Sequence, residues 1–171
     1  TDYSRATITY MDAEGYAVNT ASPKGAGIEA VSISTSETDG YGNVVRELTP
    51  QNRIRVLNPP EGETKSLKVR AEELSTERSY SPDGTEMQEE WGPLHQIRLK
   101  RDEVTKAPGE VVKARLHTTI QYDENITRYA SPDPHLPTTV TTGASVPGKG
   151  VDADQRVTKT VYDWNLRKPK E

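Results

Sequence analysis

The sequence contains no cysteine and no phenylalanine, and only 32% of its 171 residues are hydrophobic. The absence of cysteine excludes a disulfide framework and thiol chemistry. Globular domains usually approach an apolar share of about one half, so a deep core is not expected. Eight tyrosines, two tryptophans and many threonines and valines nevertheless argue against full disorder, because these residue types favour strands. The composition fits a thin sheet with two solvated margins.

Long apolar runs and blocks of one charge sign are also missing. No stretch approaches the length that spans a membrane, and no secretory leader pattern is visible. The net charge is -4 with both signs interspersed, so we expect no nucleic-acid partner. Because the sequence begins with Thr1, we interpret it as a fragment or a processed piece of a longer protein.

Five stretches of the chain share one pattern. Each opens with an alternating run rich in threonine and serine and reaches a pivot residue, which an aspartate follows in every copy except the third, where Ser81 stands. The pivots are 27 to 42 residues apart, a spacing typical of repeat architectures. The first three copies also carry a glycine four residues after the pivot. The repeat positions are Met11, Asp12, Gly15, Thr38, Asp39, Gly42, Tyr80, Gly84, Tyr122, Asp123, Tyr162 and Asp163.

The physics of one copy indicates a β-hairpin. Alternation places one set of side chains on one face of a strand. Aspartate followed by glycine makes a tight turn, because glycine tolerates positive φ and aspartate bonds the backbone two residues on. "GNVVREL" and "GTEMQEEW" then return as second strands, and a proline at Pro23, Pro50 or Pro93 ends the return strand.

We therefore predict an all-β fold of consecutive antiparallel hairpins that form a twisted sheet strip, with one short helical insertion near residues 64–74. Thr64 is the expected cap of that helix. In "TTVTTGASV" we expect one strand between loops. The predicted segments are hairpins one and two (1–58), the insertion (59–75), hairpins three and four (76–122), a loop rich in proline and glycine with one strand (123–150), and the start of the fifth copy (151–171).

These residues resemble the YD-repeat, or Rhs-repeat, proteins of bacteria, in particular the actinobacterial kind. The similarity is carried by the five registered copies and by "DGYGNVVRELTP", "SYSPDGTEMQEEWGPLH" and "TTGASVPGKGVDADQRVTKTVYDW", which together cover most of the chain. The first two pivots, Met11 and Thr38, depart from the tyrosine of the family pattern.

The resemblance implies a large secreted or cell-surface protein, in some cases associated with the cell wall. In this family the repeats form one long sheet that spirals into a hollow shell, and in polymorphic toxins the shell encloses a C-terminal toxin domain. The implied partners are the rest of the same polypeptide, with further repeats and a C-terminal effector, and glycans as a further partner. The chain is too short to close a shell, and it lacks both the self-cleavage segment and a recognisable toxin domain, so the resemblance carries architecture rather than activity.

Candidate chemical sites are sparse. His95, His117 and His135 show no paired metal-ligand spacing, and a metal site would need them to converge with carboxylates. Asp123 and Asp163 recur in register, which favours a turn role over a catalytic carboxylate pair. "DADQ" at residues 152–155 lacks the ligand series of a calcium loop. We expect no catalytic residue, no metal and no cofactor.

The aromatic residues allow two interpretations, either a platform for sugars or cross-strand pairs that hold the sheet together. They are Tyr16, Tyr41, Tyr80, Trp91, Tyr122, Tyr129, Tyr162 and Trp164. The sequence thus favours a structural repeat segment that is not an enzyme, with a carbohydrate-binding or cell-surface-binding β module as the alternative. An enzyme is the least supported class, because no converging constellation is visible.

Overall fold

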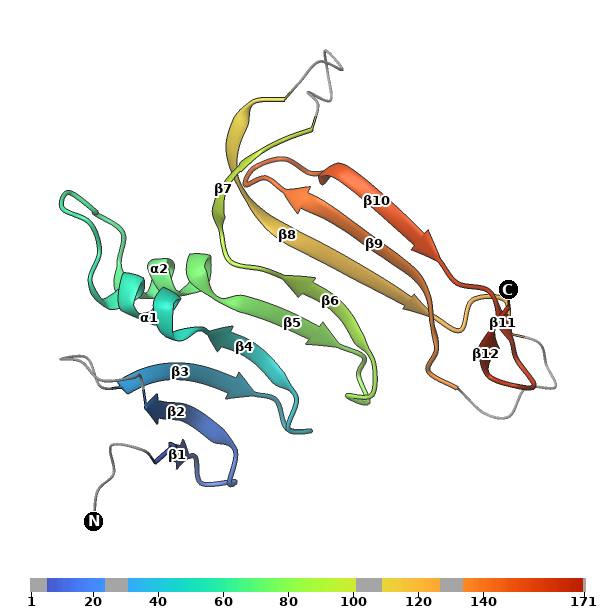
Figure 1. Ribbon diagram of the computed structural model, residues 1–171, viewed down its shortest axis with the longest axis horizontal. Coiled ribbons are helices and arrows are strands. Elements are labelled where there is room, and N and C mark those ends of the chain that lie inside the picture. Colours follow the sequence, from blue (N-terminus) through green and yellow to red (C-terminus); the bar gives the residue numbers. More distant parts are fainter. Residues whose placement is uncertain (1–5, 24–30, 101–108, 127–133, 171) are drawn as a thin grey trace. The chain divides into compact units, whose positions relative to one another are not determined.

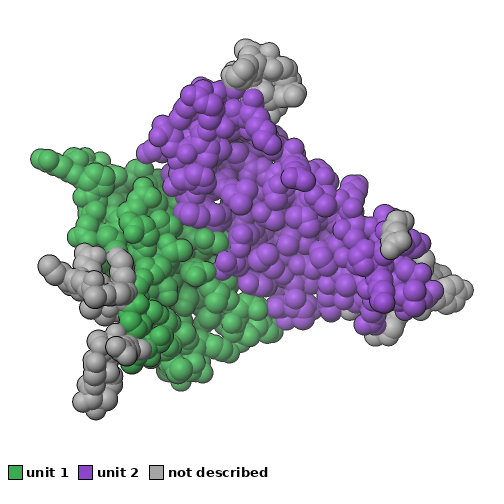
Figure 2. All heavy atoms as spheres, in the orientation of Figure 1, with its two compact units in different colours: residues 1–77 green, residues 78–171 purple. Residues whose placement is uncertain are grey.

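The computed structural model describes residues 6–23, 31–100, 109–126 and 134–170, and these residues form antiparallel strands with two short helices (Figure 1). The predicted all-β fold with a short helical insertion is therefore confirmed. The chain divides into two compact units, residues 1–77 and residues 78–171 (Figure 2). Their boundary falls inside strand β5 (Thr76–Tyr80).

In the first unit, four strands follow one another as antiparallel neighbours: β1 (Ile8–Met11), β2 (Ala17–Pro23), β3 (Val31–Thr38) and β4 (Val44–Leu48). The first two residues of β5 pair with β4. The β1–β2 and β3–β4 pairs are hairpins that close at the first two pivots. Alternating threonine, serine and valine side chains build these strands, as their period of two requires.

Two helices interrupt the strands of the first unit, α1 (Pro50–Leu57) and α2 (Leu67–Leu74). Helix α2 lies in the stretch where a helix was expected, but its N-cap is Ser66 rather than Thr64. Helix α1 was not expected. Helix α1 begins at Pro50 because the Thr49 side chain accepts a hydrogen bond from the backbone N–H of Asn52. Pro50, which follows the end of β4, also suits the first turn of a helix.

Side chains tie the two helices to each other. The side-chain amide of Asn52 donates to the backbone carbonyl of Leu74 over 2.9 Å, and Nε of Arg70 donates to the backbone carbonyl of Val56 over 3.0 Å. Both acceptors lie near helix C-termini, where carbonyls lack partners within the helix. The two helices are therefore one linked feature. None of the described helices is long and apolar enough to cross a membrane.

The second unit is organised around the long strand β8 (Val111–Tyr122). Along one edge β8 pairs first with β7 (His95–Arg98) and then with β6 (Met87–Trp91), and along the other edge with β9 (Pro137–Ser145). Strand β10 (Ala153–Lys159) continues the sheet beyond β9. The last residues of β5 and strand β6 form the third hairpin.

Two further short strands, β11 (Tyr162–Asp163) and β12 (Lys168–Pro169), pair as a separate two-stranded ribbon at the fifth copy. The hydrophobic core of the second unit is small and is built largely from alanines. Its buried members are Leu99, Ala114, Ala144 and Ala153, with Ile97, Val112 and Val146 packed against them. Such small side chains suit a thin sheet, as the low apolar share of the sequence predicts.

Candidate functional site

The first pivot closes its hairpin with a side-chain acceptor. Asp12 follows the end of β1, and its Oδ1 accepts the backbone N–H groups of Glu14 (3.0 Å) and Tyr16 (2.9 Å). The Asp12 N–H in turn donates to the Tyr16 carbonyl over 2.9 Å. Gly15 completes the turn with φ of 90°, a value that favours glycine.

The second pivot repeats this geometry after Thr38. The Oδ1 atom of Asp39 accepts the N–H groups of Tyr41 and Asn43, both at 2.9 Å. Gly42 has φ of 86°. Partial desolvation opposes ionisation of Asp39, but the hydrogen bonds from Asn43, Tyr41 and Gly42 outweigh it and lower the pKa of this carboxyl.

In the third copy the Ser81 hydroxyl is the acceptor for the turn, in place of the aspartate of the other copies. Oγ of Ser81, directly after Tyr80, accepts the N–H of Glu86 over 3.0 Å and donates to Asp83. Gly84 has φ of 75°, like the glycines of the first two turns. Hydrogen bonds from the Ser81 hydroxyl, and then from Thr85, lower the pKa of Asp83 to about 2.

The fourth copy keeps the turn but spans a much longer connection. Asp123 follows Tyr122 at the end of β8, and its two carboxylate oxygens accept the backbone N–H groups of His135 and Leu136, both at 3.0 Å. The N–H of Asp123 donates to the Leu136 carbonyl over 3.0 Å. The same strand-end closure therefore holds, although the return strand β9 begins only at Pro137.

The fifth copy is the most divergent. Asp163 lies within β11, and its Oδ1 accepts the N–H groups of Asn165 (3.0 Å) and Leu166 (3.1 Å). Arg167 takes the positive φ, 53°, that glycine supplies in the first three copies. The aspartate still caps a turn, but the two flanking strands are only two residues long.

The tyrosine pivots of the fourth and fifth copies make equivalent contacts with the preceding copy. The Tyr122 hydroxyl donates to the carbonyl of Met87 over 3.0 Å, and the Tyr162 hydroxyl donates to the carbonyl of Pro137 over 3.1 Å. Met87 and Pro137 are the first residues of the return strands β6 and β9. We call these two contacts the tyrosine clamps. Burial, together with the charge of Glu86 and the nearby Tyr80, raises the pKa of Tyr122.

An open cleft of about 1010 Å³ lies beside the third and fourth turns in the second unit. Hydroxyl, amide and carboxylate side chains dominate its lining. The residues that line it are Ser81, Pro82, Asp83, Glu86, Gln88, Glu89, Thr119, Ile120, Gln121, Tyr122, Asp123 and His135. The cleft thus collects four carboxylates, but no lysine or arginine is among the described residues that line it.

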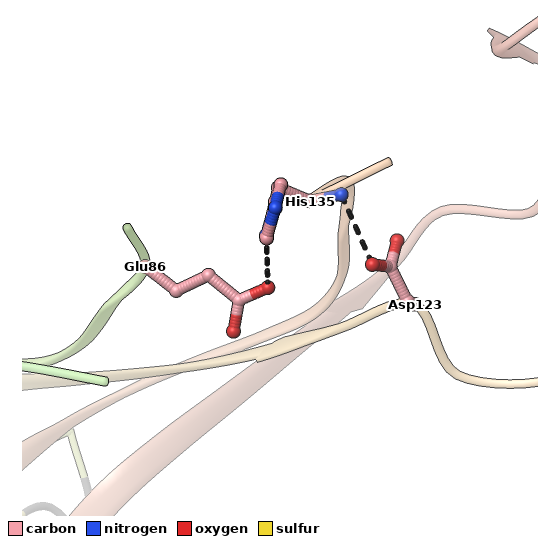
Figure 3. Close-up of side chains that lie close together, drawn as sticks. All are labelled: Glu86, Asp123 and His135. Atoms are coloured by element: carbon pink, nitrogen blue, oxygen red, sulfur yellow. Dashed lines mark hydrogen bonds and ion pairs between the residues drawn. The ribbon is translucent and has the colours of Figure 1, made fainter. Parts of the chain in front are cut away.

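Three of these side chains converge (Figure 3). Glu86 directly precedes β6, Asp123 directly follows β8, and His135 lies just before β9. Nδ1 of His135 lies 2.8 Å from Oε1 of Glu86, and one nitrogen or oxygen atom from each of the three side chains lies within 4.8 Å of the other two. We call these residues the Glu86–Asp123–His135 cluster. The convergence of a histidine with carboxylates, which the sequence did not lead us to expect, therefore occurs at His135.

A second histidine is held by a carboxylate. Nδ1 of His117, on β8, lies 2.6 Å from Oδ2 of Asp152, and the imidazole stacks on Trp91 with a ring separation of 4.8 Å and an angle of 7°. Gly143 pairs with His117 across the sheet, and its missing side chain leaves room for Asp152. His117 Nε2 is buried without a hydrogen-bond partner among the described residues.

Several other residues with candidate roles make contacts within the chain. Asp154, the second aspartate of "DADQ", accepts the backbone N–H of Lys100, whereas Asp152 binds His117. Tyr162 is buried against Trp164, with ring centroids 5.5 Å apart. Tyr129 lies outside the described residues. The described aromatic contacts therefore include the stacked and cross-strand packing that the alternative to a sugar platform requires.

Comparison of the chain with protein-family models, curated proteins and solved structures finds no match.

Proposed function

We propose that the chain is a structural segment in the wall of a secreted or cell-surface YD-repeat shell. In this role the segment encloses or presents a C-terminal toxin or effector domain of the same polypeptide, and it is not itself an enzyme. The single observation that carries the proposal is the repetition of the tyrosine clamp, in which Tyr122 and Tyr162 each bind the first residue of the preceding return strand.

The repeated tyrosine contact supports a structural role, because it connects neighbouring copies of the repeat and does not assemble a catalytic site. A catalytic group is needed once, whereas the strand-end acceptor recurs at Asp12, Asp39, Ser81, Asp123 and Asp163. Each acceptor is occupied by backbone N–H groups of its own turn. An array whose copies contact their neighbours in the same way is the physical basis of repeat proteins.

A carbohydrate-binding or cell-surface-binding module is the alternative, and the open cleft beside Tyr122 favours it. Hydroxyl, amide and carboxylate groups that line such a cleft are suitable partners for sugar hydroxyls. A glycan array probed with the folded chain tests this alternative, and signals at background would count against it.

The wall proposal is tested by reading the coding sequence on both sides of the segment. The expected result is further in-frame copies of the strand, Tyr-Asp and turn pattern, followed by a variable C-terminal domain. Stop codons close to both ends of the segment would contradict a wall role and leave the binding module as the better explanation.

A further inference from the structure

We propose that the Glu86–Asp123–His135 cluster binds a divalent transition-metal ion at the cleft beside the third and fourth turns. The proposal is independent of the role of the chain as a wall segment, because it depends only on side chains of the second unit. The cluster draws one ligand from each of three separate segments, which the strand order of β6, β8 and β9 brings together (Figure 3).

The geometry needs little adjustment to hold an ion. Ligand atoms at about 2.0–2.2 Å from a tetrahedral zinc ion lie about 3.3–3.6 Å from one another. The ligand atoms of the cluster already lie within 4.8 Å of each other. Nδ1 of His135 and Oε1 of Glu86, now 2.8 Å apart, would have to separate by roughly 0.5–0.8 Å to reach that spacing. His135 is partly exposed, with 43% of its side chain accessible, and Glu86 has a flexible stem.

The ion would take the place of one hydrogen bond within the cluster. A hydrogen bond of 2.8 Å, whose proton either atom can carry, joins Nδ1 of His135 to Oε1 of Glu86. A metal ion that replaces this proton leaves both atoms with a partner. Asp123 keeps its turn contacts with the N–H groups of His135 and Leu136, because each carboxylate oxygen has a further lone pair.

The charge of the cleft favours a cation. Asp83, Glu86, Glu89 and Asp123 line it, and among the described lining residues His135 is the one basic side chain. Asp83 is ionised throughout the neutral range, because its hydrogen bonds lower its pKa to about 2. Negatively charged carboxylates gathered in a concave site raise the local concentration of cations.

The donor set indicates which cation. One imidazole nitrogen with two carboxylates suits zinc and its first-row neighbours, whereas Ca²⁺ and Mg²⁺ prefer sets made of oxygen alone. Three protein ligands leave at least one coordination position toward the cleft for water or a further ligand. The bound ion would also join the turn of the third copy to the turn of the fourth.

Calorimetric titration of the full chain with zinc chloride tests the site. We expect one saturable site in the wild-type protein, at least tenfold weaker binding in Glu86→Gln and in His135→Gln, and unchanged binding in the matched control His95→Gln. Zinc in excess should raise the melting temperature of the wild type by several degrees and that of His135→Gln by much less. Absence of saturable binding, or equal binding in all four proteins, would overturn the proposal.

A measurement on the wild-type protein keeps the test valid if a variant fails to fold. Long-range nitrogen–proton NMR spectra report the imidazole nitrogens of the three histidines separately. Zinc should shift Nδ1 of His135 and leave His95 and His117 unchanged. A shift confined to His95 or His117 would overturn the assignment, and calcium binding more tightly than zinc would overturn the choice of a transition metal.

Discussion

Single residues decide how the strand before each of the five turns ends. An oxygen acceptor placed directly after the pivot takes the backbone N–H of the returning chain, and Ser81 does this with a hydroxyl where the other copies use a carboxylate. The sequence indicated the position but treated Ser81 as a departure. A one-dimensional pattern compares residue names, whereas the turn requires an acceptor at a given place, which serine also supplies.

The pair of His117 and Asp152 depends on a residue without a side chain. An added Cβ at Gly143 would lie 2.8 Å from Cβ of Asp152 and 3.3 Å from Cγ of Gln155. Gly143→Ala should therefore push Asp152 away from His117 and lower the free energy of unfolding by about 1–3 kcal/mol, the usual effect of overpacking. Urea denaturation measures the loss, and the NMR signals of the His117 ring report the broken contact.

Gly150→Ala is the matched control for this prediction. An added Cβ at Gly150 meets nothing within 4 Å, so this variant should retain the wild-type stability and the wild-type His117 signals. If Gly143→Ala behaved like Gly150→Ala, the close approach of Asp152 to β9 would be contradicted.

At the scale of elements, the hairpins follow from the sequence better than the helices do. The alternating side-chain pattern and the turn residues predict the strands, because the period of two and the glycine at positive φ are both local features of the sequence. The sequence pattern does not indicate helix α1, because Pro50 fits the end of a strand equally well. Proline stops strand pairing and also suits the first turn of a helix, so the residue alone does not decide between the two roles.

The third hairpin should lose stability in acid. The Ser81 hydroxyl, and then Thr85, hold the pKa of Asp83 at about 2 in the folded protein, below the ordinary value of 3.8. A carboxyl with a depressed folded pKa contributes stability above its unfolded pKa and loses that contribution as the pH falls through the folded pKa. Asp83→Asn should therefore reduce the stability at pH 5 and leave it nearly unchanged at pH 2.

Urea denaturation of the wild type and of Asp83→Asn between pH 5 and pH 2 measures this difference. The comparison is needed because Glu124, whose pKa is lowered by the hydroxyls of Thr139 and Thr138, also contributes to the acid loss of the wild type. A stability difference that stayed constant from pH 5 to pH 2 would show that the Asp83 carboxylate does not stabilise the turn.

At the scale of the molecule, the arrangement of the copies creates what no single copy contains. The cluster joins Glu86, from the turn of the third copy, to Asp123 and His135, which belong to the fourth. Sequence spacing did not predict this site, because the residues meet only when β8 lies between β6 and β9. The tyrosine pivots were predicted, but their hydroxyl partners were not, since these depend on which return strand lies alongside.

The tyrosine clamps give the most direct test that successive copies are joined in the same way. Tyr122→Phe and Tyr162→Phe each remove one hydroxyl that donates to a backbone carbonyl, and each should lower the free energy of unfolding by about 1 kcal/mol. Replacement by alanine also removes the ring and should cost about 3 kcal/mol or more. Tyr10→Phe is the control, because Tyr10 is 59% exposed on β1.

The decisive measurement is urea denaturation of Tyr122→Phe, Tyr162→Phe, the double variant and Tyr10→Phe under one set of conditions. The repeat interpretation predicts similar losses for the two single variants, a loss of about 2 kcal/mol for the double variant because the clamps have separate partners, and no change for Tyr10→Phe. Wild-type stability in both clamp variants would contradict the claim that the pivot tyrosines join one copy to the next.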